Sequence, residues 1–424
     1  MSQPVASLPG FRDFFPAACA ARNYVFAAWR AVAARYGFHE WEGPVLESTD
    51  LYRKKSGDEI LGQLFHFEDK GGREVALRPE LTPTLARLVA ARHRDFKKPL
   101  KWFEIGSCFR YEAPQKGRLR EFYQWNADVL GEASPEADAE LIALGIDALR
   151  EMGFTAEDFA VRLSSRTLWD GLLTEQQISP EQTAAFLQII DKWDREKPGA
   201  LDARLRALGS SHEAVAAFIE RAREDETPFA ALLDSLRARG MREFVRIDPG
   251  IVRGLAYYTG TVFEFFSLRV GMRAIAGGGR YDRLVGIMSD GGVDMPAVGF
   301  GMGDVVLGDL LSETPHTKEK MDAWLSRYAT LEAYVVIADD TRRADALALL
   351  QQLRAAGIRA DAPLSPAKVG KQFQAAEAAG ARAAIVIGGE FPAVKIKNLK
   401  TREEREISIE KAVEEVRANL IAQT

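Results

Sequence analysis

Cysteine is nearly absent from this chain: Cys19 and Cys108 are its two examples among 424 residues. Such a distant pair provides no disulfide framework, and the five histidines form no cluster with the spacing of a zinc site. Long apolar runs are missing too, so the sequence predicts no membrane-spanning segment and no membrane partner. The first residues have neither the basic region nor the apolar core of a signal peptide. We therefore expect a cytoplasmic protein in a reducing compartment.

An excess of positive charge is also missing, because the formal net charge is −5. The surface as a whole does not indicate a polyanion partner, so any such contact must come from local groups of Lys and Arg. The length of 424 residues and a hydrophobic content of 47% are enough for two or three globular domains.

The most informative stretch is 100–131. Residues 102–110 alternate with β-type period and residues 121–130 indicate a second strand, so the sequence predicts a hairpin. Its loop contains turn-forming Pro114 and Gly117. The charged residues of the loop and its base are Arg110, Glu112, Lys116, Arg118 and Arg120. A polar tip of this kind fits either a solvated turn or a phosphate site, whereas Arg110, inside an apolar strand, needs an acid, a phosphate or solvent as partner.

The order of residues in this hairpin is more specific than its composition. Phe-Arg-Tyr-Glu at 109–112, Pro-Gln-Lys-Gly-Arg at 114–118 and Glu-Phe-Tyr-Gln at 121–124 resemble the second signature motif of class II aminoacyl-tRNA synthetases, in the form carried by histidyl-tRNA synthetases. The resemblance implies a catalytic role for Arg110 at ATP. It also implies ATP contacts for Glu112, Arg118 and Phe122, with Phe122 stacking on adenine.

A second segment, Leu-Arg-Pro-Glu-Leu-Thr at 77–82, lies on a predicted strand-to-helix turn. From position alone Glu80 is either a helix cap or a ligand group. In histidyl-tRNA synthetases the matching segment binds the α-amino group of histidine, which implies that role for Glu80 and Thr82. An ammonium group needs a carboxylate and a further acceptor, so the assignment is chemically reasonable.

The strand after the hairpin loop places Phe122, Gln124, Asn126 and Asp128 on one face. This face is polar, and it is either solvated or the floor of a binding site. The family resemblance implies that Gln124 lies near the amino group of histidine and Asp128 near its imidazole. Many members have Glu where Asp128 stands.

The most specific signature is Arg-Gly-Leu-Ala-Tyr-Tyr-Thr-Gly-Thr-Val-Phe-Glu at 253–264. Arg253 could be a plain strand-end charge, but the resemblance makes it a catalytic cation that touches the α-phosphate and the histidine carboxylate. It further implies that Tyr257 and Tyr258 bind histidine. Many members have Asp where Ala256 stands.

Two glycine-rich segments complete the pattern. Ala-Gly-Gly-Gly-Arg-Tyr-Asp at 276–282 allows close approach by a ligand or by another strand, and the resemblance implies that Tyr281 lies beside the imidazole. Residues 296–307 resemble the third class II motif, but Val306 stands where an arginine over adenine is expected. The resemblance then requires Arg118 or another cation to replace it.

The remaining segments also resemble parts of class II synthetases. The helix at 17–36 and the strand at 38–45, interrupted by Pro44, resemble the first class II motif and imply a homodimer. Residues 331–424 alternate β-α-β-α-β, which favours a partly parallel sheet and resembles the anticodon-binding domain of class II synthetases. Its lysines are either solvated or phosphate contacts: Lys368, Lys371, Lys395, Lys397 and Lys400.

We therefore predict an α+β protein with a six-stranded antiparallel catalytic sheet flanked by helices. The expected segments are 1–164 and 243–312 for the two parts of the catalytic domain, 165–242 for a helical insertion, 313–330 for a linker, and 331–424 for the anticodon-binding domain. The implied reaction activates L-histidine with ATP, with Mg²⁺ held through ATP and no protein metal site, and transfers histidine to its tRNA.

The alternative is a catalytically silent histidine sensor, like the synthetase-like regulatory subunit of ATP phosphoribosyltransferase. Such paralogues usually lack the C-terminal domain and erode the signature that contains Arg253, and this chain retains both.

Overall fold

The computed structural model describes residues 6–115, 117–193, 196–252, 258–269, 274–328 and 330–421. The chain divides into two compact units, Met1–Met321 and Asp322–Thr424. Each unit has its own core. Within the described ranges, every helix is too short or too polar to cross a bilayer.

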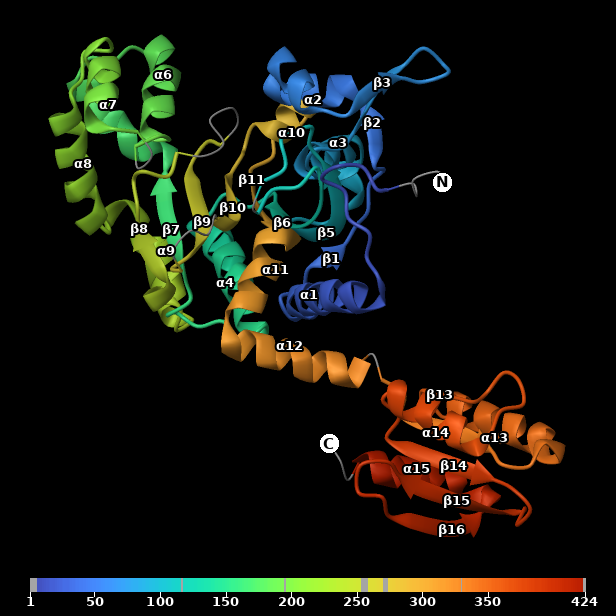
Figure 1. Ribbon diagram of the computed structural model, residues 1–424. Coiled ribbons are helices and arrows are strands. Elements are labelled where there is room, and N and C mark those ends of the chain that lie inside the picture. Colours follow the sequence, from blue (N-terminus) through green and yellow to red (C-terminus); the bar gives the residue numbers. More distant parts are fainter. Residues whose placement is uncertain are drawn as a thin grey trace. The chain divides into compact units, whose positions relative to one another are not determined.

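A mixed sheet organises the first unit, and its described part has eight strands (Figure 1). In spatial order the strands are β1 (His39–Glu40), β5 (Leu100–Phe109), β6 (Glu121–Leu130), β11 (Ala297–Gly303), β10 (Ala274–Arg280), β9 (Thr261–Ser267), β7 (Phe159–Ser165) and β8 (Val245–Ile247). The six strands from β5 to β7 are antiparallel throughout, while β1 and β8 pair in parallel at the two edges. The predicted six-stranded antiparallel sheet is confirmed, and the structure adds an edge strand on each side.

One face of this sheet is covered by helices and forms the main core. Helix α1 (Pro16–Arg35) packs against both α4 (Pro135–Glu151) and α11 (Asp304–Glu313), and α4 and α11 contact the central strands. Trp29 of α1 stacks on Trp125 of β6 with ring centroids 5.8 Å apart, and Phe300 of β11 meets Trp125 edge to face at 5.2 Å. Each such buried aromatic side chain contributes about 1.5–3 kcal/mol of burial free energy. Because side chains alternate along β6, the neighbours of Trp125 point to the opposite face.

A smaller sheet and several helices follow α1 along the chain. The strands, in the order β2 (Leu46–Ser48), β4 (Glu74–Leu77) and β3 (His66–Glu68), are all antiparallel neighbours. The helical segments nearby are α2 (Thr49–Ser56), η1 (Asp58–Gln63), α3 (Thr82–Arg92), η2 (His93–Asp95) and α10 (Leu284–Met288). Pro83 lies in the first turn of α3, as predicted.

The prediction of one strand at 38–45 is wrong. The structure forms the short strand β1 before Trp41 and the separate strand β2 after Pro44. Proline has no backbone N–H to donate to a ladder, so the chain leaves the large sheet there and joins the small one.

The segment between β7 and β8 is helical. It contains η3 (Arg166–Trp169), α5 (Asp170–Glu175), α6 (Pro180–Ile190), α7 (Pro198–Arg206), α8 (His212–Glu224), η4 (Thr227–Phe229), α9 (Ala230–Ala238) and η5 (Arg242–Phe244). Trp169, Phe186 and Phe218 form part of its own core. The lone His212 stacks on Trp193 at 4.5 Å, so it has a structural partner.

Residues 313–330, which we predicted as a linker, contain helix α12 (Pro315–Tyr328). The second unit then forms a sheet in the order β13 (Ala360–Asp361), β12 (Ala333–Ile337), β14 (Ala383–Ile387), β15 (Ala393–Asn398) and β16 (Glu404–Ser408). Its helical segments are η6 (Asp340–Arg342), α13 (Arg343–Ala355), α14 (Val369–Ala378), η7 (Ile409–Lys411) and α15 (Ala412–Ile421). β13, β12 and β14 are parallel and the last two strands are antiparallel, as the sequence predicted for a partly parallel sheet.

Candidate active site

On the face of the large sheet opposite the buried Trp125, the neighbouring strands β10 and β11 carry glycines at facing positions. Gly277 of β10 pairs with Gly301 of β11, and Gly279 pairs with Gly299. Residues directly opposite each other in an antiparallel pair point to the same face. These paired positions therefore form a floor made of backbone, which we call the glycine floor.

Polar side chains of β6 lie over this glycine floor. A Cβ atom added at Gly299 would lie 1.8 Å from Oδ1 of Asp128, and one added at Gly301 would lie 1.8 Å from Nε2 of Gln124. No side chain fits at such a separation. Gly299 and Gly301 therefore admit the side chains of the neighbouring strand β6. In the segment 276–282, where the sequence left open a ligand or another strand, a Cβ atom at Gly278 would lie 2.3 Å from the main-chain oxygen of Gly299, so another strand approaches there.

A cavity of about 790 Å³ lies over one part of the floor. Its polar and aromatic lining residues are Arg110, Arg118, Phe122, Gln124, Arg162, Glu264 and Phe266. A smaller cavity of about 270 Å³ is lined by Glu80, Thr82, Asn126, Tyr258, Tyr281 and Phe300. Arg110, Gln124, Gly277 and Gly301 line both cavities. The two spaces therefore meet at Arg110 and Gln124.

Arg110 is held at this junction from two sides. Its Nε atom donates to the main-chain oxygen of Pro79 at 3.1 Å, and its guanidinium carbon lies 5.1 Å from the ring centroid of Phe122. Arg110, held in this way, lines both cavities. Arg118, farther along the hairpin, forms an ion pair with Glu112.

The large cavity contains a second strand-borne arginine that sequence reasoning missed. Arg162 of β7 lies 3.8 Å from the ring centroid of Phe266, and its Nε atom is 3.5 Å from Oδ2 of Asp248. Val305 and Val306, in the first turn of α11, line the same cavity. The space that contains Val306 thus has guanidinium groups available from Arg118 and Arg162.

A buried ion pair anchors the turn that carries Glu80. Nη1 of Arg78 is 2.6 Å from Oε1 of Glu104 and donates to the main-chain oxygen of Gly43 at 3.0 Å. Both side chains of the pair are almost fully buried. Gly106 leaves room for the arginine, because a Cβ atom there would lie 2.2 Å from Nη2 of Arg78. The strand end before Glu80 is therefore fixed to β5.

In the small cavity, Thr82 and Asn126 are joined by a hydrogen bond from Nδ2 of Asn126 to Oγ1 of Thr82 at 3.1 Å. The carboxylate of Glu80 accepts from Nζ of Lys55 at 2.6 and 2.5 Å. Among the described residues, Oδ1 of buried Asn126 has no hydrogen-bond partner. This cavity thus offers hydrogen-bond acceptors for a cationic ligand group.

Asp128 is fully buried and is not one of the lining residues of either cavity. The hydroxyl of Tyr281, which lines the small cavity, donates to its Oδ1 atom at 2.5 Å. Burial raises the pKa of Asp128 to about 7, and the hydrogen bond from Tyr281 opposes this rise. Oδ2 has no hydrogen-bond partner in the described part of the chain. This carboxyl group therefore changes charge near neutral pH.

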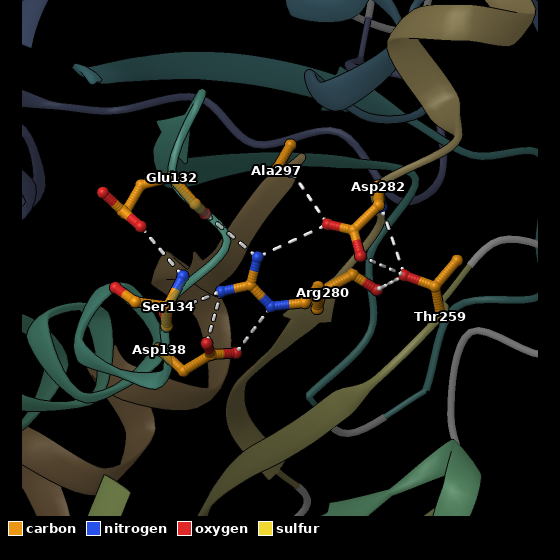
Figure 2. Close-up of polar contacts among 7 residues, drawn as sticks. All are labelled: Glu132, Ser134, Asp138, Thr259, Arg280, Asp282 and Ala297. Carbon is orange, nitrogen blue, oxygen red and sulfur yellow. Dashed lines mark hydrogen bonds and ion pairs between the residues drawn. The ribbon is translucent and has the colours of Figure 1, made fainter. Parts of the chain in front are cut away.

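The residue before Tyr281 belongs to a buried polar network (Figure 2). The guanidinium of Arg280 forms an ion pair with Asp138 of α4 and donates to the main-chain oxygens of Glu132 and Ser134 at 3.0 and 3.2 Å. Burial raises the pKa of Asp138, and Arg280 opposes this rise. The network ties the end of β10 to the junction of β6 and α4.

Asp282, on the other side of Tyr281, extends this network (Figure 2). Its Oδ1 atom accepts from the backbone N–H of Ala297 at 3.1 Å, and its Oδ2 atom accepts from the hydroxyl of Thr259 at 3.1 Å. Thr259 follows Tyr258, which lines the small cavity. The two tyrosines are therefore held by residues adjacent to them in the sequence.

Comparison with protein families decides the classification. Residues 10–303 match the family model of histidyl-tRNA synthetase, and residues 332–419 match that of an anticodon-binding domain. The chain belongs to the histidyl-tRNA synthetase family. The prediction of this family from the hairpin motif is confirmed.

Curated relatives cover nearly the whole chain. A protein named histidine–tRNA ligase from Opitutus terrae is 43% identical over 97% of this chain and 98% of its own length. Another of that name from Natronomonas pharaonis is 38% identical over 95% of both chains.

Solved structures share the fold. The crystal structure of histidyl-tRNA synthetase from Nostoc sp. PCC 7120 matches with a TM-score of 0.79 at 24% identity, covering 99% of this chain and 100% of that one. A structure from Bacillus halodurans, titled as an ATP phosphoribosyltransferase regulatory subunit/histidyl-tRNA synthetase, has a TM-score of 0.71 at 24% identity and covers 88% and 97%. The class II synthetase fold is confirmed.

The structure brings most of the predicted site residues together. Glu80, Thr82, Gln124, Tyr258 and Tyr281 line the small cavity, while Arg110, Arg118 and Phe122 line the large one. Glu112 reaches the site through Arg118, and Asp128 through Tyr281. Arg253, Tyr257, Ala256 and Lys116 lie outside the described residues. Within the described ranges, no group of three or more His, Cys, Asp or Glu side chains is arranged to hold a metal ion.

Sequence reasoning missed Arg162 and Lys55 as site residues. Arg162 has the same signal that identified Arg110, a guanidinium inside an apolar strand, and could have been found by it. Lys55 has no local signal, because its partner Glu80 lies 25 residues away and is brought to it by tertiary structure.

Proposed function

We propose that this chain is a histidine–tRNA ligase. It joins L-histidine to ATP, forming histidyl-adenylate and pyrophosphate, and then transfers the histidyl group to the 3′-terminal ribose of histidine tRNA with release of AMP. The observation that carries the proposal is the pair of cavities that meet at Arg110 and Gln124. A nucleotide site and an amino-acid site must meet in this way if a carboxylate oxygen is to attack the α-phosphorus.

The large cavity is proposed to bind ATP. Phe122 provides one stacking face for adenine, while Arg110, Glu112 and Arg118 hold the phosphates and their Mg²⁺ ion. Arg118 and Arg162 line the same cavity as Val306, so either guanidinium can take the place of the arginine expected at that position. Mg²⁺ bound through ATP would neutralise phosphate charge.

The small cavity is proposed to bind histidine. Glu80, Thr82 and Gln124 receive its α-ammonium group, while Asp128, Tyr258 and Tyr281 surround its imidazole. Asp128 lies behind Tyr281 and holds the hydroxyl of that residue, whose oxygen can accept a hydrogen bond from an imidazole N–H. Tyr257 and Arg253 are assigned to this site by their sequence motif.

Catalysis is proposed to rest on positioning and on positive charge. Arg110 and Arg253 stabilise the negative charge that develops at the α-phosphate as the carboxylate oxygen attacks. The bond from the α-phosphorus to the bridging oxygen of pyrophosphate breaks in the same step. No covalent bond to the enzyme is needed.

The other parts of the chain receive family roles in this proposal. Residues 1–164 and 243–312 form the catalytic domain, 165–242 an insertion near the tRNA acceptor arm, 313–330 a connection, and 331–424 the anticodon-binding domain. A homodimer through the first motif is supported by exposed apolar side chains on and next to the small sheet, at Val45, Leu46 and Phe67. We retain the cytoplasm as the compartment.

A silent histidine sensor is the second candidate, and the Bacillus halodurans neighbour is the observation that favours it. At 24% identity that neighbour establishes a shared fold alone. The anticodon-binding domain at 332–419 and the retained 253–264 signature favour the ligase.

Histidine-dependent exchange between ATP and labelled pyrophosphate tests the proposal. We expect exchange by the unaltered chain, and a fall in kcat of about 10²–10³-fold for Arg110→Ala, because one stabilising donor at the phosphate is lost. Arg120→Ala is the matched control, since Arg120 lies on the same hairpin and contacts Tyr111 instead of either cavity. Binding of histidine without any exchange would favour the sensor.

A further inference from the structure

Lys55 is a buried lysine beside the small cavity. It lies in the last turn of α2, and its side chain is 5% exposed. Its ammonium group donates to both carboxylate oxygens of Glu80, at 2.6 and 2.5 Å. Lysine is almost never buried unless it is paired, so the environment of this side chain is built around Glu80.

Glu80 faces the small cavity, and Lys55 lies behind it. Glu80 is 20% exposed and lines the small cavity, whereas Lys55 is not among the lining residues. The ammonium group therefore contacts Glu80 from behind. A carboxylate has about four lone-pair positions, and Lys55 uses one on each oxygen, so Glu80 can still accept from a ligand.

The charges nearby make this support necessary. Burial lowers the pKa of Lys55, the charge of Glu80 opposes that effect, and the charge of Arg110 adds to it. Glu80 and Arg110 line the same small cavity. A glutamate that is free to rotate would pair with that guanidinium across the cavity, because arginine and carboxylate groups form strong bidentate pairs.

We propose that Lys55 is a positioning residue of the amino-acid site. It holds the carboxylate of Glu80 against α2, so that this group faces the α-ammonium of the substrate and does not pair with Arg110. The inference rests on the proposed function, in which Glu80 receives that ammonium group. It adds a role for helix α2, to which neither the motifs nor the family comparison assigned a site residue.

The test compares three ligands of the full-length protein by calorimetry. Histidine has both an ammonium and a carboxylate group, histidinol keeps the ammonium group alone, and imidazole propionate keeps the carboxylate alone. For Lys55→Met we expect affinity for histidine and histidinol to fall by about 10–100-fold, because the Glu80 carboxylate then pairs with Arg110 and no longer faces the ammonium group. Affinity for imidazole propionate should stay within about 2-fold, which a general distortion of the site would not allow.

Lys54→Met is the matched control. Lys54 lies next to Lys55 on α2, is half-exposed, and pairs with the exposed carboxylate of Asp290. It should bind all three ligands like the unaltered chain. In pyrophosphate exchange, Lys55→Met should raise the KM for histidine and lower kcat, because Arg110 then pairs with Glu80 and stabilises the α-phosphate less.

Equal losses for all three ligands, or no loss for any, would overturn the inference. Lys55→Gln retains a hydrogen-bond donor and serves if the methionine variant does not fold, and it should show the same ligand-selective loss at smaller size. If the unaltered chain binds and exchanges with histidine but neither variant is selective, this inference alone fails. If the unaltered chain binds no histidine, the proposed function fails together with it.

Discussion

Asp128 shows how one buried carboxyl group links stability to substrate recognition. Burial raises its pKa from 3.8 to about 7, and one of its oxygens lacks a partner among the described residues. An acid with a raised pKa stabilises the folded state at low pH, and this contribution is lost as the pH rises through about 7. Its proposed role is to hold the hydroxyl of Tyr281 beside the imidazole of histidine.

We predict that Asp128→Asn changes the pH dependence of stability. The amide cannot ionise and can still accept from Tyr281, so the variant should gain melting temperature relative to the unaltered chain at pH 8 and gain less at pH 5. Thermal unfolding without ligand at both pH values measures this difference. Asp290→Asn is the control, because Asp290 is exposed. An equal shift at both pH values would contradict the assigned pKa. The same variant should raise the KM for histidine.

At the scale of single residues, prediction from sequence worked where a motif carries the information. Arg110, Glu80 and Tyr281 were assigned through family motifs, and the structure places them around one small cavity. Arg162 and Lys55 belong to no such motif. Arg162 lines the large cavity because β7 pairs with β9 in the sheet. Lys55 reaches Glu80 because α2 packs against α3, which follows Glu80 in the chain.

Two glycines of strand β11 differ in how much space surrounds them. A Cβ atom at Gly301 would collide with the amide of Gln124, whereas one at Gly303 would meet no atom within 4 Å. We predict that Gly301→Ala moves the Gln124 side chain and raises the KM for histidine by about 10-fold, equivalent to one lost hydrogen bond. Gly303→Ala, on the same face of the strand, adds its methyl group at the large cavity and should leave the KM for histidine unchanged. The KM values from pyrophosphate exchange decide, and similar effects of both variants would contradict the steric explanation.

The network around Arg280 gives a prediction about the packing of β10 against α4. Arg280→Met leaves the carboxylate of Asp138 buried without its cation, so the free energy of unfolding should fall by about 3–5 kcal/mol. Adding Asp138→Asn removes the unpaired charge and should recover part of that loss. Denaturant titration of the three variants measures both steps. A double variant no more stable than Arg280→Met would show that the ion pair is not the source of the effect.

Secondary structure was predictable where local signals agree. The hairpin at 100–131 and the helix before Gly37 follow from period and turn residues, and both are found. The strand at 38–45 was not predictable in this way, because the segment that contains Pro44 connects a strand of the large sheet with a strand of the small one. The order of the central strands could not be derived from spacing either, since β10 and β11 are the last strands of this sheet along the chain and insert between β6 and β9.

At the scale of the whole molecule, the proposed active site and the proposed anticodon-binding domain belong to different compact units. Each of the two compact units has its own sheet and core, and the family models match them separately. In the second unit Lys368 and Lys371 are exposed at the start of α14. Lysines at such a position suit contacts to phosphate.

We predict that changing both lysines to glutamate raises the KM for histidine tRNA by about 10-fold or more, because phosphate contacts are replaced by repulsion. The rate of histidine-dependent pyrophosphate exchange should not change. Aminoacylation assays at several salt concentrations measure the effect, which should weaken as salt rises. Lys411→Glu, an exposed lysine in the same unit, is the control. A loss of exchange activity in the double variant would mean that the two units are not functionally separate.

The backbone floor has a consequence for inhibitors. Main-chain atoms have no rotamers, so the part of the floor that lines both cavities, at Gly277 and Gly301, should keep its contour as ligands change. Movement is left to side chains of the walls, such as Gln124. A compound shaped to the floor would meet the same surface before and after adenylate formation, whereas a compound that binds only the walls would meet a different one at each stage.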